Sequence, residues 1–247
     1  MNASSITTVM DNWMPIPSDP RCLIHNTINS MSNLFYEFIL VVNINNYKVE
    51  FISMASGLAR RMSQYDIQDK SFPYIFETIS GLNPKQVDPV FEKIISFYQK
   101  ADESERPYLS FMADFPFILN EYKSIATYKF APLSQLGNGK PLHFVVSISY
   151  ATGQLENQIM AINTSTGIRK ICSLKDSCWI DYQLPQLTPI ELSVLALSAQ
   201  GLSVNEIAPI VSKAIDSVKS IRKRIFTKFN VDNITRAIIF AINNRII

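Results

Sequence analysis

The clearest pattern of apolar and polar positions lies near the carboxyl end of the chain, in residues 213–229. Apolar residues recur there at spacings of three, four and four, and these are Val218, Ile221, Ile225 and Phe229. On a helix that advances about 100° per residue, this spacing gathers the apolar side chains on one side. The opposite ridge is polar and basic: it consists of Lys219, Ser220 and Lys223, with Arg222 and Arg224 on its flanks. The pattern therefore predicts a helix with one buried face and one basic face.

Three further helices are predicted around this basic helix. Residues 188–191, Thr-Pro-Ile-Glu, form a capping box that begins a helix through about Ser198, and Gly201 ends it. A second capping box, Ser-Val-Asn-Glu at residues 203–206, begins a short helix that is followed by a tight turn and the basic helix. A fourth helix is expected from about Asp232 to Asn243. Two short helices, a tight turn and a basic second helix are typical of a helix-turn-helix.

The amino-terminal half shows a different pattern, in which strands alternate with helices. Its first strands form a predicted hairpin, and further strands follow a helical region that Pro73 and Gly81 interrupt. The predicted strands are residues 38–44, 47–51, 108–118, 122–131, 142–150, 158–163 and 168–173, and the helices lie within 55–80 and 88–99. The fold class expected from these elements is an α+β unit with an antiparallel sheet, followed by an all-α unit of four helices.

The chain divides on this basis into four segments. They are an amino-terminal leader at 1–33, the α+β domain at 34–152, an extra hairpin and linker at 153–186, and the helix-turn-helix domain at 187–247. Charge follows the same division. Residues 186–247 carry 8 basic and 4 acidic side chains, whereas residues 1–185 carry 15 basic and 17 acidic ones. The positive charge lies where a polyanion such as double-stranded DNA would bind.

The carboxyl-terminal segment resembles the DNA-binding domain of LuxR-type regulators over about 60 residues. The residues that carry the resemblance, in order, are Leu187-Thr188-Pro189, Glu191, Val194-Leu195, Gly201, Ser203, Glu206-Ile207-Ala208, Val218-Lys219, Ile225, Lys228 and Val231. The resemblance implies a transcriptional regulator in which Lys219, Ser220 and Lys223 read base edges. Phosphate contacts are expected from Ser217, Arg222, Arg224 and Lys228.

Several residues depart from the LuxR pattern. Ile190 replaces an arginine, Ile221 stands where a histidine is common, and Ala214 stands where a serine caps the recognition helix. The missing cap costs about 1 kcal/mol if nothing compensates, and Asp216 and Ser217 in the first turn are expected to compensate in part. Pro209 should bend or shorten the second helix. These features leave open an alternative function, a protein-interaction adaptor whose helix-turn-helix no longer binds DNA.

The order of elements in residues 34–152 is similar to that of a PAS domain, which implies a sensing or dimerisation role. An unknown small molecule or protein partner is then expected at this domain. Six phenylalanines could line a ligand pocket, although core packing explains them at least as well. They are Phe35, Phe38, Phe51, Phe72, Phe76 and Phe91.

The fourth helix has apolar residues on more than one face, which suggests a partner beyond its own domain. Pairing of two copies through Ile234, Ile238 and Ile242 would give a homodimer that matches a palindromic operator. The alternative is packing of this helix against the amino-terminal domain.

No enzymatic site is indicated. His25 and His143 are the only histidines, and neither has a cluster of metal-ligating or catalytic residues near it in sequence. The three cysteines, Cys22, Cys172 and Cys178, have no metal-like spacing, so they are interpreted as ordinary thiols of a reducing cytoplasm. No cofactor, signal peptide or membrane span is expected.

Overall fold

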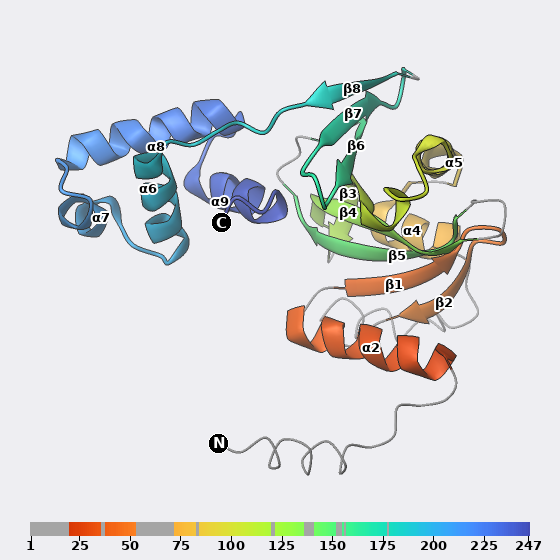
Figure 1. Ribbon diagram of the computed structural model, residues 1–247. Coiled ribbons are helices and arrows are strands. Elements are labelled where there is room, and N and C mark those ends of the chain that lie inside the picture. Colours follow the sequence, from red (N-terminus) through yellow and green to blue (C-terminus); the bar gives the residue numbers. More distant parts are fainter. Residues whose placement is uncertain are drawn as a thin grey trace, which may run out of the picture.

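The computed structural model describes residues 20–35, 38–52, 72–82, 84–119, 122–135, 141–151, 155, 157–176 and 178–247. Its central feature is an eight-stranded sheet in the order β2-β1-β5-β4-β3-β6-β7-β8 (Figure 1). The strands are β1 (Phe38–Asn43), β2 (Lys48–Ile52), β3 (Leu109–Leu119), β4 (Tyr122–Gln135), β5 (Pro141–Tyr150), β6 (Gln158–Asn163), β7 (Arg169–Ser173) and β8 (Trp179–Tyr182). Each neighbouring pair is antiparallel.

Both predicted hairpins are present in the sheet. In the first, Val41 of β1 lies opposite Phe51 of β2. In the second, Ile162 of β6 lies opposite Arg169 of β7. The second hairpin is continuous with the main sheet, because β6 pairs with β3 from Ile159 to Asn163. Strand β8 forms within the segment that was expected to be linker, where Trp179 and Ile180 supply strand-favouring side chains.

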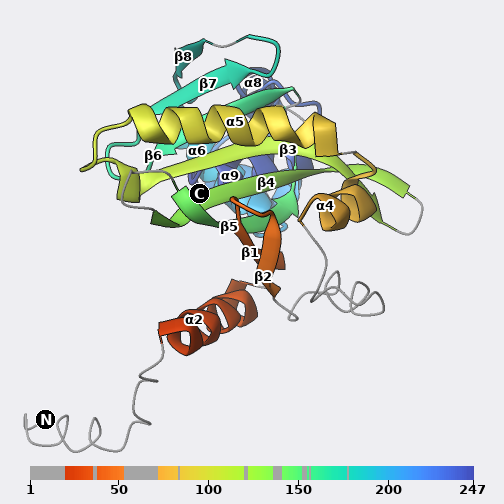
Figure 2. The ribbon, with the colours of Figure 1, turned by 90° about the vertical axis from the view of Figure 1, so that its right-hand side faces the viewer.

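Helices α4 (Phe72–Ser80) and α5 (Pro84–Lys100) cover one face of the sheet (Figure 2). Alternate residues of β1 point toward these helices and are buried with Phe91 of α5. The core between sheet and helices is filled by aromatic rings, including Phe72, Phe76, Phe91, Phe111, Phe115, Tyr128, Phe130 and Phe144. The core-packing interpretation therefore holds for Phe38, Phe72, Phe76 and Phe91, and Phe51 is buried in a smaller cluster with Ile39 and Val41 of β1. The side chain of Phe35 lies outside the described residues.

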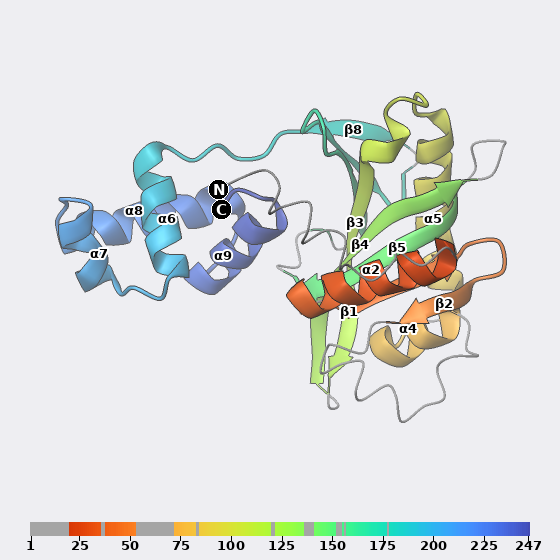
Figure 3. The same cartoon turned by 60° about the horizontal axis from the view of Figure 1, so that its bottom comes forward.

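Helix α2 (Pro20–Phe35) begins inside the stretch that was expected to be leader, and its sequence pattern did not predict it. Its Ile28 is 5% exposed and packs with Ile39 and Val41 of β1. These are the residues of β1 that point away from α4 and α5, so α2 lies against the other face of the sheet (Figure 3). The predicted helix at 55–80 lies outside the described residues as far as residue 71, and α4 is its remainder.

Four helices follow an extended segment at residues 183–188. They are α6 (Pro189–Ala199), α7 (Val204–Ile210), α8 (Ile215–Phe229) and α9 (Ile234–Asn243). Their buried side chains form a core separate from that of the sheet. The expected fold class is confirmed: an α+β unit with an antiparallel sheet and helices is followed by an all-α unit of four helices.

The two units touch at the end of α9, on the sheet face opposite α5 (Figures 1 and 2). Arg169 Nη2 on β7 donates to the carbonyl oxygen of Asn244 at 3.3 Å. Ser149 Oγ on β5 donates to Asn243 Oδ1 at 3.5 Å. Among the described residues, no helix has both the length and the hydrophobicity needed to cross a membrane.

Candidate nucleic-acid interface

Helix α8 has the two faces that its sequence predicts. Its apolar row, Val218, Ile221, Ile225 and Phe229, is at most 4% exposed and packs into the core of the four-helix unit. The ridge opposite this row, Lys219, Ser220 and Lys223, is exposed. The helix is thus fixed along its back by its neighbours, while its polar front remains open to a partner.

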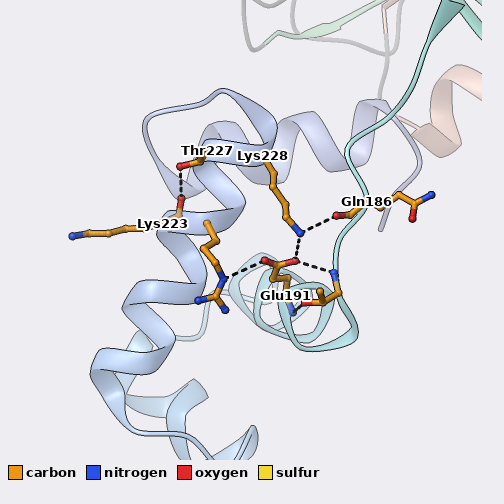
Figure 4. A network of polar contacts seen from close by, with 7 residues as sticks. Gln186, Glu191, Lys223, Thr227 and Lys228 are labelled. Carbon is orange, nitrogen blue, oxygen red and sulfur yellow. Dashed lines mark hydrogen bonds and ion pairs between the residues drawn. The ribbon is translucent and has the colours of Figure 1, made fainter.

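The ridge residues make only local contacts. Lys219 Nζ lies 3.0 Å from Asp216 Oδ1, and Ser220 Oγ donates to the Asp216 carbonyl oxygen at 2.9 Å. Both contacts are exposed and lie within one turn of the helix, so water or DNA can replace the ion pair at small cost. Lys223 extends away from the rest of the domain (Figure 4).

Glu191 of α6 anchors the far end of α8. Its side chain is 2% exposed, and Lys228 Nζ donates to its Oε2 at 2.7 Å. Arg224 Nε donates to Oε1 at 3.4 Å, and the backbone N–H of Thr188 donates to Oε2 at 2.8 Å within the predicted capping box (Figure 4). Lys228 Nζ also donates to the carbonyl oxygen of Gln186 at 3.0 Å. A single carboxylate therefore joins the start of α6 to two basic residues of α8.

The environment of Glu191 changes its pKa. Burial acts to raise the pKa, but the hydrogen bonds from Lys228 and Thr188 and the charge of Lys228 outweigh it and lower the pKa to about 2. The carboxylate is therefore ionised at neutral pH and neutralises much of the charge of Lys228. Two of the expected phosphate ligands, Arg224 and Lys228, are thus partly engaged by Glu191. Arg224 remains 56% exposed, whereas Lys228 is 35% exposed.

Arg222 was expected to contact phosphate, but its guanidinium is bonded within the domain. Its Nη2 donates to Ser198 Oγ at 2.8 Å and to the carbonyl oxygen of Leu202 at 3.1 Å. Its Nε is buried without a partner among the residues that the structure describes, and burial lowers the pKa of the guanidinium. Arg222 therefore connects α8 to α6 and to the loop before α7 instead of standing free on the flank of the helix.

The start of α8 has no side-chain cap. Ala214 occupies the N-cap position with φ −67° and ψ 152° and offers no acceptor to the first amides. Asp216 and Ser217 are exposed in the first turn, where the aspartate faces the positive end of the helix dipole. The turn before α8 includes Ser212 with φ 52°, a left-handed conformation that is uncommon for residues other than glycine.

Helix α7 is short and ends one residue after Pro209. Its capping box is complete, with Ser203 and Glu206 bonded as the sequence predicts. The helix before it ends as predicted at Gly201, whose φ of +89° places it in the left-handed region. The helix-turn-helix geometry is therefore intact despite the proline.

The three isoleucines expected at a dimer contact differ in burial. Ile234 and Ile238 are partly buried against the core of their own unit, whereas Ile242 is 57% exposed. The next residues, Asn243 and Asn244, contact the amino-terminal sheet. The end of α9 thus belongs to the contact between the two units, which is the alternative that the sequence left open.

The histidines and cysteines were the candidates for catalysis or metal binding. His143 Nε2 lies 3.1 Å from Glu50 Oε2 and 3.4 Å from Asn43 Nδ2 on neighbouring strands, as a satisfied strand histidine does. The side chain of His25 lies outside the described residues. Cys172 is buried, and Cys22 and Cys178 are exposed free thiols. Within the ranges that the structure describes, no group of three or more His, Cys, Asp or Glu residues is arranged to hold a metal ion.

Comparison with known protein families decides what the four-helix unit is. Residues 185–241 match the family model described as "Bacterial regulatory proteins, luxR family". These residues are a LuxR-family helix-turn-helix domain. The match begins within the extended segment and includes α6, α7 and α8 and most of α9. A comparison with curated proteins finds no match.

Three solved structures illustrate what the chain is similar to. The response regulator ChrA of a heme-sensing two-component system is 32% identical over 27% of this chain and 33% of its own, with a TM-score of 0.25. The chain therefore spans a third of ChrA. A Vibrio cholerae VqmA dimer without target DNA is 15% identical over 88% of this chain and 86% of its own, with a TM-score of 0.31. The PAS-B domain of Drosophila melanogaster Cycle is 12% identical over 45% of this chain and 97% of its own, with a TM-score of 0.31.

Sequence reasoning missed the second role of Glu191. The capping box identified this residue as the partner of the Thr188 amide, and that contact is present. Its ion pairs with Arg224 and Lys228 join positions far apart in the sequence, and spacing within one helix carries no signal for them. Ser198 was likewise predicted only as the end of α6, although its hydroxyl accepts a hydrogen bond from Arg222.

Proposed function

We propose that this protein is a DNA-binding transcriptional regulator in which α8 of the LuxR domain enters the major groove. The observation that supports the proposal is the exposed polar ridge of α8, which lies opposite a fully buried apolar row. A helix in the major groove needs short donors toward base edges and a rigid back that fixes its register. Lys219, Ser220 and Lys223 are the proposed base-reading residues.

The phosphate contacts are assigned to residues on the flanks of this ridge. Ser217 is exposed in the first turn of α8, and Arg224 is half exposed beside Glu191. Lys228 would contribute a phosphate contact from the last turn, with its charge partly offset by Glu191. For Arg222 we propose a positioning role instead of direct binding, because its guanidinium is bonded to Ser198 and Leu202.

The PAS-like domain is proposed to act as the sensing or dimerisation unit, and the protein to act as a homodimer. A ligand that prefers one arrangement of the two units would change how the recognition helices of two copies are spaced. Pairing through Ile234, Ile238 and Ile242 fits this proposal where α9 is released from the sheet. The exposure of Ile242 and the hydrogen bonds that Asn243 and Asn244 make to the sheet support a contact at the end of α9 that could change between the two arrangements.

A titration of duplex DNA with the full chain at two salt concentrations tests the proposal. The first step is selection of bound fragments from a pool of random duplexes. Binding to a selected fragment should weaken steeply with salt, since each neutralised phosphate releases counterions. Arg224→Ala should lower affinity for selected and random duplexes alike and flatten the salt dependence by about one unit of slope.

The second candidate function is the protein-interaction adaptor. The uncapped start of α8 at Ala214 and the early end of α7 at Pro209 are the observations in its favour. An adaptor would select no fragment from the pool and would not bind duplex DNA even at low salt. That result would favour the adaptor function over the regulator function.

A further inference from the structure

A cavity of about 360 Å³ lies beneath the carboxyl-terminal end of α5, against the part of the sheet formed by β3, β6, β7 and β8. Its walls are mostly apolar. Phe97 of α5 and Trp179 of β8 contribute aromatic rings whose centroids are 4.6 Å apart, and Leu109 and Ile168 contribute aliphatic surface. The volume and the lining are those of a small-molecule site.

This cavity borders the phenylalanine-filled core, because Leu109 and Ala161 belong to that core and also line the cavity. The rings of Phe72, Phe76 and Phe91 pack between the helices and the central strands, and none of them lines the cavity. The cavity instead uses the part of the sheet that the second hairpin and β8 add beyond β3. A ligand there would not need to displace the aromatic core.

Two polar groups at the cavity have unused hydrogen-bonding capacity. Asn163 is 7% exposed, and its Oδ1 accepts from the amides of Ser165 and Thr166, while its Nδ2 has no partner among the described residues. Lys100 at the end of α5 is exposed and has no ion-pair partner in the described part of the chain. The third nitrogen at the cavity, Lys170 Nζ, is bonded to Asp181 at 2.8 Å. The Asn163 amide and the Lys100 ammonium are therefore available to donate to an acceptor on a bound molecule.

We propose that this cavity binds a small aromatic molecule that carries a hydrogen-bond acceptor, such as an acid group. The ring would stack against Phe97 and Trp179, which favour planar partners over aliphatic ones. The acceptor would meet Lys100 and Asn163, and Glu105 at the cavity edge would accept from any donor on the ring. The proposal rests on the sensing role proposed for the PAS-like domain and assigns that role a place and a ligand class.

The position of the cavity connects it to the LuxR domain. Ile168 and Lys170 of the second hairpin line the cavity, and Arg169 lies between them in the sequence. Because successive residues of a strand point to opposite faces, Arg169 projects to the other side of the sheet. There its Nη2 donates to Asn244 at the end of α9. A ligand that contacts Ile168 and Lys170 therefore contacts the same strand whose Arg169 is hydrogen-bonded to the LuxR domain.

Titration of the full chain with the fluorescent aromatic sulfonate 1-anilinonaphthalene-8-sulfonate tests the site without DNA. The wild type should show saturable fluorescence enhancement. Ile168→Trp, which fills the cavity, should weaken probe binding by about tenfold or more, a loss of about 1.4 kcal/mol. Ile180→Trp is the matched control, because Ile180 is 56% exposed against 55% for Ile168 and does not line the cavity.

A second pair of variants tests the acceptor. Lys100→Met should weaken binding of the sulfonate probe by about tenfold, since it removes a charge-assisted contact. Lys85→Met, at an exposed lysine near the other end of α5, should leave it unchanged. Enhancement that does not saturate, or that is equal in wild type, Ile168→Trp and Lys100→Met, would overturn the site. If Ile168→Trp fails to fold by circular dichroism, the Lys100→Met and Lys85→Met pair decides. Failure to bind DNA is measured separately and bears only on the proposed function.

Discussion

Replacing Glu191 by glutamine keeps the shape of the side chain but removes the charge that holds α6 and α8 together. The carboxylate is 2% exposed and accepts hydrogen bonds from Lys228 Nζ at 2.7 Å and the Thr188 amide at 2.8 Å. Glutamine offers one acceptor instead of two, and its amide group would face Lys228 or Arg224. Two cations then lose their counter-charge, and the less exposed of them, Lys228, is 35% exposed.

The magnitude follows from the pKa of Glu191. A fall from the ordinary value of 4.5 to about 2 corresponds to about 3 kcal/mol of stabilisation at neutral pH. Because the pKa is lower in the folded state, this contribution is fully present above pH 4.5 and is lost as the pH falls toward 2. Near pH 3 it should amount to about 1 kcal/mol. Glu191→Gln should therefore destabilise the LuxR domain by about 3 kcal/mol at neutral pH and by much less near about pH 3.

Hydrogen exchange followed by mass spectrometry measures this effect in the full chain. Peptides from residues 189–199 and 215–229 report the opening free energy of α6 and α8 separately from the sheet. Glu206→Gln is the matched control, because Glu206 occupies the same position in its own capping box with the same hydrogen-bond lengths but has no basic partner in the described part of the chain. The anchoring role of Glu191 would be refuted if Glu191→Gln lowered the opening free energy of α6 and α8 no more than Glu206→Gln does. It would also be refuted if the decrease were as large near about pH 3 as at neutral pH.

Three further variants test other parts of the account. Ala214→Ser should supply the missing cap of α8 and raise the unfolding free energy of the LuxR domain by about 1 kcal/mol in urea titrations, and no gain would mean that the first turn is already satisfied. Arg222→Met should cost about 1–3 kcal/mol of stability, because the bonds to Ser198 and Leu202 are lost, and Arg222→Lys should not restore it. If Arg222→Lys instead kept wild-type stability and DNA affinity, a phosphate contact would replace the positioning role. Arg169→Ala should release the end of α9 from the sheet and speed proteolysis within residues 183–188. Lys170→Ala, on the other face of the strand, should leave the cleavage rate unchanged, and equal rates in both variants and the wild type would show that the Asn244 contact does not hold the units together.

The sequence predicted the LuxR domain well because its signals are local. Capping boxes, a glycine stop and an apolar row each act within a few residues, and Thr188, Ser203 and Gly201 occupy the expected cap positions. Strands β1 to β7 were also found, since alternation within a strand is a local signal, whereas β8 lies in the segment that was expected to be linker. Helix α2 was missed because its apolar residues depend on contacts with the distant strand β1.

The contacts of the basic residues of α8 could be predicted only in part from their positions on the helix. With Lys223 at 0° on the helix, Phe229 falls near −120° and Arg222 near −100°, whereas Lys228 falls near +140° beside Ile221 at +160°. Arg222 and Lys228 therefore border the buried row more closely than Arg224 does at +100°. Their inward contacts follow from this asymmetry, but the partners Ser198 and Glu191 lie on another helix and had to come from the structure.

Comparison of Lys223→Ala on selected and random duplex DNA tests the central claim most directly. Lys223 is exposed, extends away from the domain and lies in the middle of the ridge that is proposed to read bases. The variant should lose about 1–3 kcal/mol of affinity for the selected duplex and tolerate change at one base pair, with little loss on random sequence. Lys85→Ala in the amino-terminal domain should change neither. Equal losses of Lys223→Ala on both kinds of DNA, or no loss on either, would contradict base reading by the α8 ridge.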